Sequence, residues 1–410
     1  MCRALGLAAV LAVCVRATLP SQWETVCSTY FGDKREGSCP VPARMDAALA
    51  VEGGRYVHVF GGTGGSVPRS DLWTYDSAAR AWALGNADWR EESADWAAPV
   101  CTADPAHPRA APMPRTGAVV APRAGGLLFV GGGVCRQYDA GSSGAGGGAG
   151  WDAPAAPVAD YWAYARATQQ WARAWPAAHT LPNTTRFASA VHAGRLYVFG
   201  GVDNTTDPAH PVYSNTLWEI DGTTDNNIGG NKNNNFDGTS TTTATWATTT
   251  TPMARVVELA EGSAVPPARA DHTAVVAGGH MYVFGGRNAT GVHGDLWAYS
   301  FAERTWACVP PRGAAPLPRY AHAAAVCAAA APDMSDVVVV YGGSSGLALL
   351  GTDVHAYSVG QRTWLALEQN GDAPSRRARA SLACGPNGEL WLFGGIDETG
   401  RVLNDFYRMY

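Results

Sequence analysis

A short apolar run that ends in two glycines recurs along this chain. One copy reads Met281-Tyr-Val-Phe-Gly-Gly286, and both of its alternating faces are apolar, as in a strand buried between two packed layers. Glycine permits the positive φ, or the close approach of another backbone, that the following turn requires. Such self-similarity decides the architecture before any local assignment does. The six pairs are Gly61–Gly62, Gly131–Gly132, Gly200–Gly201, Gly285–Gly286, Gly342–Gly343 and Gly394–Gly395.

The residues around each pair indicate a four-stranded unit. An arginine-led run precedes the pair, a third β-prone run contains a tyrosine, and a fourth begins near a tryptophan. A single four-stranded unit cannot bury its own faces, so several must stack. A radial stack also protects the strand edges. In four units the tyrosine precedes the tryptophan by seven residues: Tyr75 and Trp82, Tyr164 and Trp171, Tyr299 and Trp306, Tyr357 and Trp364.

This pattern resembles the kelch repeat, and the resemblance covers nearly the whole chain after residue 17. It implies an all-β, six-bladed kelch β-propeller over residues 18–410, related to the central domain of galactose oxidase. The copies are longer than the usual kelch period of about 50 residues, which indicates insertions. We expect two low-complexity insertions, at residues 136–159 and 221–251. The second delays the fourth strand of the third unit to about Trp246.

The two ends of the chain complement each other. The last copy stops within Asn404–Tyr410, which matches only a third strand. Near the start, Gln22-Trp23-Glu-Thr-Val26 is similar to the fourth-strand stretch Thr305–Val309. We therefore expect Trp23 to belong to the last blade, with the N-terminal strand pairing there to close the ring without an open edge.

The first residues predict a secretory route. Residues 1–17 contain an early positive charge, an apolar run and Val15-Arg16-Ala17, which together are typical of a signal peptide cut after Ala17. The alternative is that this run stays as an anchor. No later stretch is long and apolar enough to span a bilayer. Three sequons agree with a secreted or lumenal glycoprotein: Asn183, Asn204 and Asn288.

The cysteines predict disulfide bonds, since an oxidising compartment favours them. Cys27 with Cys39 would fasten the N-terminal strand to the start of the first blade. Cys101 with Cys135 would join two loops on one face. The sequence contains no Cys-x-x-Cys, which excludes a zinc knuckle or redox pair of that spacing. Three further cysteines keep their pairing open, and one thiol stays free or pairs between molecules: Cys308, Cys327 and Cys384.

Each unit opens with an arginine, and the turns place these arginines near the mouth of the central channel. In some kelch proteins such a ring resembles a carboxylate-binding rosette, which would make it a partner site. The alternative is that each arginine braces its own blade through backbone carbonyls or a neighbouring aspartate. We expect His272 and His322, three residues after their arginines, to be structural. The arginines are Arg44, Arg115, Arg186, Arg269, Arg319 and Arg377. Third-strand tryptophans are expected to pack between blades: Trp73, Trp162, Trp218 and Trp297.

The sequence favours binding over catalysis. A formal net charge of −5 gives no footprint for nucleic acid or for an anionic membrane. No Gly-x-Ser-x-Gly, His-Glu-x-x-His or phosphate-loop motif occurs, and we expect no metal or cofactor. We predict a non-catalytic binding module, secreted or lumenal, that holds a protein or glycan on the arginine-ringed loop face. The alternative is a carbohydrate-active enzyme of the mutarotase or epimerase type, because the fold alone does not decide function.

Overall fold

All regular structure in the described part of the chain is β-strand. None of these residues forms a helix that could cross a membrane. The predicted signal peptide, Asn183, Asn204, Cys101, the insertion at 221–251 and most of the insertion at 136–159 lie outside the described residues. The computed structural model describes residues 20–28, 39–64, 68–86, 112, 114–123, 127–131, 134–136, 155–157, 161–175, 184–203, 210–220, 254–328, 335–351 and 353–410.

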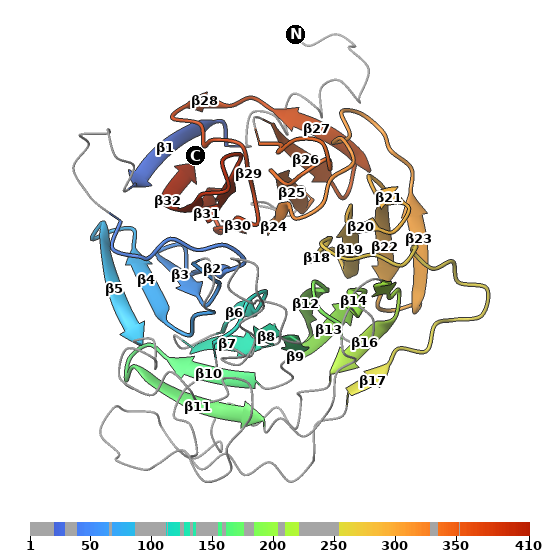
Figure 1. Cartoon of the computed structure of the whole chain (residues 1–410), viewed down its shortest axis with the longest axis horizontal. Coiled ribbons are helices and arrows are strands. Elements are labelled where there is room, and N and C mark those ends of the chain that lie inside the picture. The colour runs from blue at the N-terminus through green and yellow to red at the C-terminus, as the bar shows by residue number, and fades with distance from the viewer. Residues whose placement is uncertain are drawn as a thin grey trace, which may run out of the picture.

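Five sheets repeat one pattern of four antiparallel strands in chain order, the first strand innermost, around a common centre (Figure 1). The first two are β2 (Ala48–Glu52), β3 (Tyr56–Phe60), β4 (Leu72–Asp76) and β5 (Ala81–Asn86), then β6 (Val119–Arg123), β7 (Leu127–Gly131), β10 (Tyr161–Ala165) and β11 (Gln170–Trp175). The third is β12 (Ala188–His192), β13 (Arg195–Phe199), β16 (Leu217–Ile220) and β17 (Ala254–Val256). The last two are β18 (Thr273–Ala277), β19 (His280–Phe284), β22 (Leu296–Ser300) and β23 (Thr305–Val309), then β24 (Ala323–Cys327), β25 (Val337–Tyr341), β26 (Val354–Ser358) and β27 (Thr363–Leu367).

Short hairpins extend three of the loops between second and third strands. In the second, third and fourth blades these loops carry a two-stranded ribbon of their own. The ribbons are β8 (Val134–Arg136) with β9 (Ala155–Pro157), β14 (Val202–Asp203) with β15 (Val212–Tyr213), and β20 (Arg287–Asn288) with β21 (Gly291–Val292).

The last sheet joins the two ends of the chain. Its order is β28 (Asn370–Gly371), β1 (Gln22–Cys27), β32 (Val402–Met409), β31 (Leu390–Asp397) and β29 (Arg377–Ala378), and β30 (Ser381–Cys384) also pairs with β31. As predicted, the N-terminal strand β1 runs antiparallel to β32, with Trp23 opposite Met409 (Figure 1). The structure has five four-stranded blades rather than the predicted six. The last sheet differs because β28 lies beside β1 and because two short strands, β29 and β30, pair with β31 on either side of Arg379, where the described residues of the other blades have at most a single bridge before their first strand.

The glycine pairs are explained by contacts with the next sheet. The amide of Gly62 donates to the carbonyl oxygen of Arg115 at 2.9 Å, and Gly395 donates in the same way to Arg44 at 3.0 Å. A Cβ on Gly61 would lie 2.7 Å from the Arg115 carbonyl oxygen, and its φ is +65°. Only glycine therefore allows neighbouring sheets to approach this closely.

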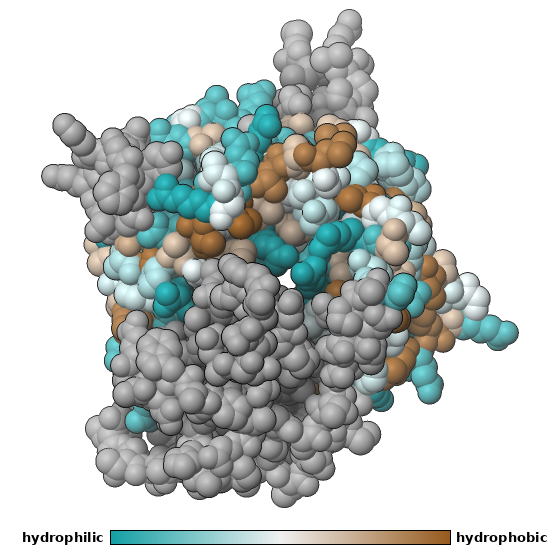
Figure 2. Space-filling view, in the orientation of Figure 1, coloured by the Kyte–Doolittle hydropathy of each residue, from teal (hydrophilic) through white to brown (hydrophobic). Residues whose placement is uncertain are grey.

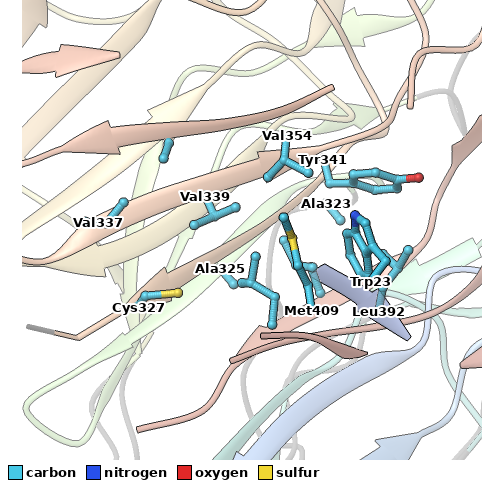
Figure 3. Packing of buried hydrophobic residues seen from close by; sticks show 13 residues of the cluster. Trp23, Ala323, Ala325, Cys327, Val337, Val339, Tyr341, Val354, Leu392 and Met409 are labelled. Atoms are coloured by element: carbon cyan, nitrogen blue, oxygen red, sulfur yellow. The ribbon is translucent and has the colours of Figure 1, made fainter. Parts of the chain in front are cut away.

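Paired aromatic rings fill each blade. The seven-residue step places Tyr299 directly opposite Trp306 on neighbouring strands, with ring centroids 5.2 Å apart. The other three tyrosine–tryptophan pairs lie at 4.9 to 5.3 Å. The ring centroids of Trp23 and of Tyr341 in β25 lie 5.9 Å apart. Trp23 therefore fills the core between the last two sheets, beside Met409 (Figure 3).

The third blade departs from this pattern. Its fourth strand is β17, Ala254–Val256, so the prediction of a strand near Trp246 was wrong. Ala254 pairs with Ile220, at the positions where the other blades place tryptophan and tyrosine. Because this blade lacks that aromatic pair, a prediction based on the position of a tryptophan placed the strand too early in the sequence.

Two disulfides lie in the described residues. Cys27–Cys39 is present as predicted, and it joins β1 to the segment that leads into the first blade. Cys327–Cys384 links the inner strands β24 and β30. Cys308 on β23 is free and exposed. The predicted Cys101–Cys135 pair remains untested, because Cys101 lies outside the described residues.

Candidate functional site at the channel mouth

Most of the predicted arginine ring is buried. Arg44 donates to the Gly61 carbonyl oxygen at 2.9 Å and grips both carboxylate oxygens of Asp71 at 2.6 and 2.7 Å. This bidentate clasp joins the first strand of the blade to its second and third. The arginines without exposed surface are Arg44, Arg115, Arg269, Arg319 and Arg377.

Two other blades and the last sheet contain an arginine–aspartate pair at the same position. Arg269 bonds to Asp295 at 2.7 and 2.8 Å, Arg377 to Asp405 at 2.6 and 2.9 Å, and Arg319 to Asp353 at 3.1 Å. Burial raises the pKa of Asp295, but the hydrogen bonds and the charge of Arg269, together with the hydrogen bond from Trp297, outweigh burial and the pKa is lowered. These guanidiniums are already hydrogen-bonded to aspartates inside the sheets. The expectation that they contact a partner is therefore wrong, and the bracing alternative holds for them.

The third blade explains why Arg186 differs from the others. Arg186 stands fourteen residues before Gly200, whereas Arg44 and Arg269 stand 17 and 16 residues before their glycines. Thr184 therefore occupies the clasp position, and Thr216 occupies the place of the aspartate. Both charges are replaced together, and Arg186 lies two residues further on, partly exposed.

His272 and His322 are buried in the walls of the channel mouth, as the structural interpretation predicts. The His322 ring bonds to the Thr273 hydroxyl at 2.8 Å. Burial, with Arg269 nearby, lowers the pKa of His272 from 6.5 to about 3. Burial, with Arg319, likewise lowers the pKa of His322. Both rings are therefore neutral at pH 7.

These histidines predict acid sensitivity. A histidine whose pKa is lower in the folded state stabilises the fold above pH 6.5, and this stabilisation is lost as the pH falls towards 3. The protonation of His272 in the unfolded chain alone should lower the free energy of unfolding by about 2 kcal/mol at pH 5 relative to pH 7. Between pH 7 and pH 5, the melting temperature of His272→Asn should fall by less than that of wild type. The exposed His210→Asn is the control, and equal drops in all three proteins would contradict the assignment.

A second ring of residues lies at the channel mouth itself. Each member follows its clasp position by two residues and has a positive φ: Asp46 (54°), Gly117 (66°), Arg186 (57°), Asp271 (55°), Ala321 (52°) and Arg379 (56°). Main-chain bonds link successive members. The Asp46 amide donates to the Arg379 carbonyl oxygen at 3.0 Å, and the Ala321 amide donates to Asp271 at 2.7 Å.

Side chains are retained in this ring despite the strain. A non-glycine residue costs about 1–2 kcal/mol in the left-handed region. Gly117 shows that glycine fits the position, so the backbone does not require a side chain. Strain that is kept where a less strained residue would fit is typical of functional sites.

The charged side chains of this ring, with Arg287 from the end of a neighbouring glycine pair, form what we call the collar: Asp46, Arg186, Asp271, Arg287 and Arg379. Arg379 bonds to Asp46 at 2.7 Å. The Asp271 side chain is only 5% exposed. Its carboxylate oxygens lie 2.8 Å from a guanidinium nitrogen of Arg287, 3.6 Å from one of Arg186 and 3.9 Å from one of Arg379. The pKa of the Arg379 guanidinium is raised, and the negative charge of Asp46 is the main cause. Three arginines thus share two carboxylates.

The collar leaves positive charge accessible. Its arginines are 26–34% exposed, whereas the clasp arginines are fully buried. Below the collar lies a channel of about 660 Å³, lined by the innermost strands of all the sheets. Hydrophilic residues border the central opening in Figure 2. Within the described residues, no group of three or more His, Cys, Asp or Glu is placed to hold a metal ion.

The sequence pattern selected the buried arginine in every repeat except the third. It missed Asp46, Asp271, Arg287 and Arg379, which lie after the arginine or after the glycine pair rather than at the arginine. The aspartate before each third strand was the available signal, because it identifies the first arginine as one half of an internal pair. Arg186 alone, from the predicted ring, belongs to the collar.

Comparison with known sequences defines the class of protein. Residues 146–395 match the family described as the KLHDC2/KLHL20/DRC7 Kelch-repeats domain. The match spans more than half of the 410 residues, so the chain belongs to this family of kelch-repeat domains.

Individual relatives are similar over part of the chain. The leucine-zipper-like transcriptional regulator 1 homolog of Drosophila melanogaster is 27% identical over 174 residues, which are 40% of this chain and 16% of that protein. Kelch repeat-containing protein 2 of Saccharomyces cerevisiae is 29% identical over 153 residues, 35% of this chain and 17% of the other. Kelch domain-containing protein 10 of Rattus norvegicus is 29% identical over 163 residues, 35% and 36% of the two chains.

Proposed function

We propose that this chain is a non-catalytic binding module that holds a protein partner at the collar. The observation that carries the proposal is the contrast between the two sets of arginines. The clasp arginines are consumed by internal aspartates, while Arg186, Arg287 and Arg379 outnumber their two carboxylates and stay partly exposed. Their excess charge and partly exposed guanidiniums suit an acidic side chain of a partner.

Two further features support a protein ligand. Membership of a kelch-repeat family agrees with a protein-interaction module. The collar also lies at the open end of a channel with loops around it, where propellers present variable contacts on a rigid scaffold. We prefer a protein to a glycan because the accessible groups are charged donors rather than an aromatic platform.

We also propose the secretory route and a closed ring. Asn288 in β20 keeps its sequon on a partly exposed hairpin, directly beside collar residue Arg287. A mass shift on endoglycosidase treatment that is smaller by one glycan in Asn288→Gln than in wild type would support a glycan there, since the sequons at Asn183 and Asn204 remain. The hydrogen bonds from Asp46 to Arg379 and from Gly395 to Arg44 support a ring that closes between the last sheet and the first blade.

Affinity capture tests the collar. Arg186→Asn with Arg379→Asn introduces side chains that tolerate positive φ and removes two positive charges. All variants are produced in a host that adds no N-linked glycans, because Arg379→Asn would create an acceptor sequon with Ser381. Capture of partner from a secretory fraction should fall at least about tenfold, as for a charged hot spot. Arg80→Asn is the matched control, since Arg80 also has a positive φ of 52° but is 68% exposed on the outer rim. Equal capture by all three proteins would refute the site.

A further inference from the structure

An ordered turn beside the collar presents a leucine to solvent. Leu347, at the tip of the loop between β25 and β26, is 99% exposed. The turn is held by its own serines: the Ser345 amide donates to the Ala348 carbonyl oxygen at 3.0 Å, and the Ser344 hydroxyl accepts from Gly346 at 3.1 Å. A large apolar side chain is thus displayed on a pre-organised turn, which lowers the entropy cost of binding through it.

Other apolar side chains lie beside this turn. A Cβ on Gly346 would be 3.5 Å from Val292 Cγ2, so the turn lies against the β20–β21 hairpin. The loop after that hairpin contacts Pro318 through Gly294, and the neighbouring Leu317 is 62% exposed. We call Val292, Leu317 and Leu347 the apolar ridge.

Direct contacts connect the ridge to the collar. Ser344, at the base of the turn, exchanges main-chain hydrogen bonds with Tyr320 at 2.9 and 3.0 Å. The guanidinium of Arg287 lies 4.4 Å from the centre of the Tyr320 ring, and Arg287 bonds to Asp271. An apolar surface and an excess of positive charge are therefore parts of one continuous surface, within reach of a single bound segment.

We propose that the ridge and the collar together bind an extended peptide segment that carries a carboxylate and, a few residues away, a large apolar side chain. The carboxylate meets the collar arginines, and the apolar side chain packs on Leu347 and its neighbours. Charge complementarity selects this occupant, because an entirely apolar segment would leave the collar arginines desolvated without a partner. The proposal rests on the collar as the binding site and adds the chemistry of the ligand.

Selection from a displayed random peptide library tests both parts. On wild type, we expect enriched peptides to contain an acidic residue and a large apolar residue at a fixed spacing. On Leu347→Ser, the acidic preference should remain and the apolar preference should disappear. A wild-type-selected peptide should bind Leu347→Ser about tenfold more weakly by fluorescence polarisation. Leu84→Ser is the control, since Leu84 is 42% exposed on the outer strand β5.

The outcomes separate the two claims. Acidic peptides without an apolar preference, or equal binding to Leu347→Ser, would overturn the ridge and leave the collar standing. Apolar peptides without an acidic preference, which bind equally to Arg186→Asn/Arg379→Asn, would overturn the collar and with it the combined ligand. A selection on wild type that enriches no consensus would overturn both.

Discussion

Removal of β1 is expected to lower the free energy of unfolding by at least about 5 kcal/mol. Truncating a buried tryptophan costs about 3–5 kcal/mol, and Trp23 is only 2% exposed, in the core shared with β25. Loss of the Cys27–Cys39 disulfide adds about 2–4 kcal/mol. Removal also leaves β32 with an open edge in the last sheet. Denaturant unfolding of a chain lacking residues 20–28 measures the effect.

A rearranged chain separates the role of β1 from its position at the N-terminus. Tyr410 exchanges main-chain bonds with Gln22 at 3.0 Å, so β32 and β1 could be joined as a hairpin. A chain that starts at Cys39, continues to Tyr410 and then passes through Asn-Gly into residues 20–28 should regain most of the stability. Cys27→Ser/Cys39→Ser gives the disulfide contribution alone. If the rearranged chain were as unstable as the truncated one, pairing with β32 would not be the source of the stability.

Breaking one clasp is expected to be almost as costly. Arg44→Met leaves Asp71, 5% exposed, without its counter-charge, and removal of one partner of a buried pair costs about 3–5 kcal/mol. In Arg44→Met/Asp71→Asn most of this loss should be recovered, because no buried charge remains. The third blade, with Thr184 and Thr216, shows that the pair can be replaced as a unit.

The first blade contains a matched control for the clasp. Arg55 and Asp76 form the same bidentate pair, with bonds of 2.9 and 2.7 Å, but Arg55 is 52% exposed. Arg55→Met should therefore change stability little, because exposed ion pairs are weak. Similar losses for Arg55→Met and Arg44→Met in denaturant unfolding would contradict the distinction between clasp and surface pair.

The repeat made the fold predictable. The glycine pairs mark close contacts between sheets, and the seven-residue step from tyrosine to tryptophan corresponds to two rings directly opposite on adjacent strands. Trp23 could be placed because its local sequence matches other fourth strands. The third blade could not be placed, since Ile220 and Ala254 replace its aromatic pair and a long insertion intervenes. The positive φ before each innermost strand has no local sequence signal, since aspartate, glycine, arginine and alanine all occupy that position.

The site was less predictable for a physical reason. In the first, fourth and last repeats the arginine and the charged residue two positions later lie close together, yet the arginine is buried inside its sheet and the other residue lines the channel mouth. The backbone conformation decides which side chain faces the channel mouth. Asp271 and Arg379 adopt a positive φ that cannot be predicted from their residue types. The aspartate before the third strand reveals the buried member, as Asp71 does for Arg44. The collar becomes visible only when residues from several blades meet in space.

The collar can be tested most directly by comparing two substitutions that act on one ion pair. Arg379→Asn removes a positive charge from the collar, whereas Asp46→Asn removes the carboxylate that occupies Arg379 at 2.7 Å. Both positions have a positive φ, which asparagine tolerates, and both side chains are about a quarter exposed. Both variants are produced in a host without N-glycosylation, because Arg379→Asn would create an acceptor sequon with Ser381. In affinity capture of the same partner, we predict weaker capture by Arg379→Asn and stronger capture by Asp46→Asn than by wild type. Capture that changes in the same direction for both, or in neither, would contradict a binding role for the collar.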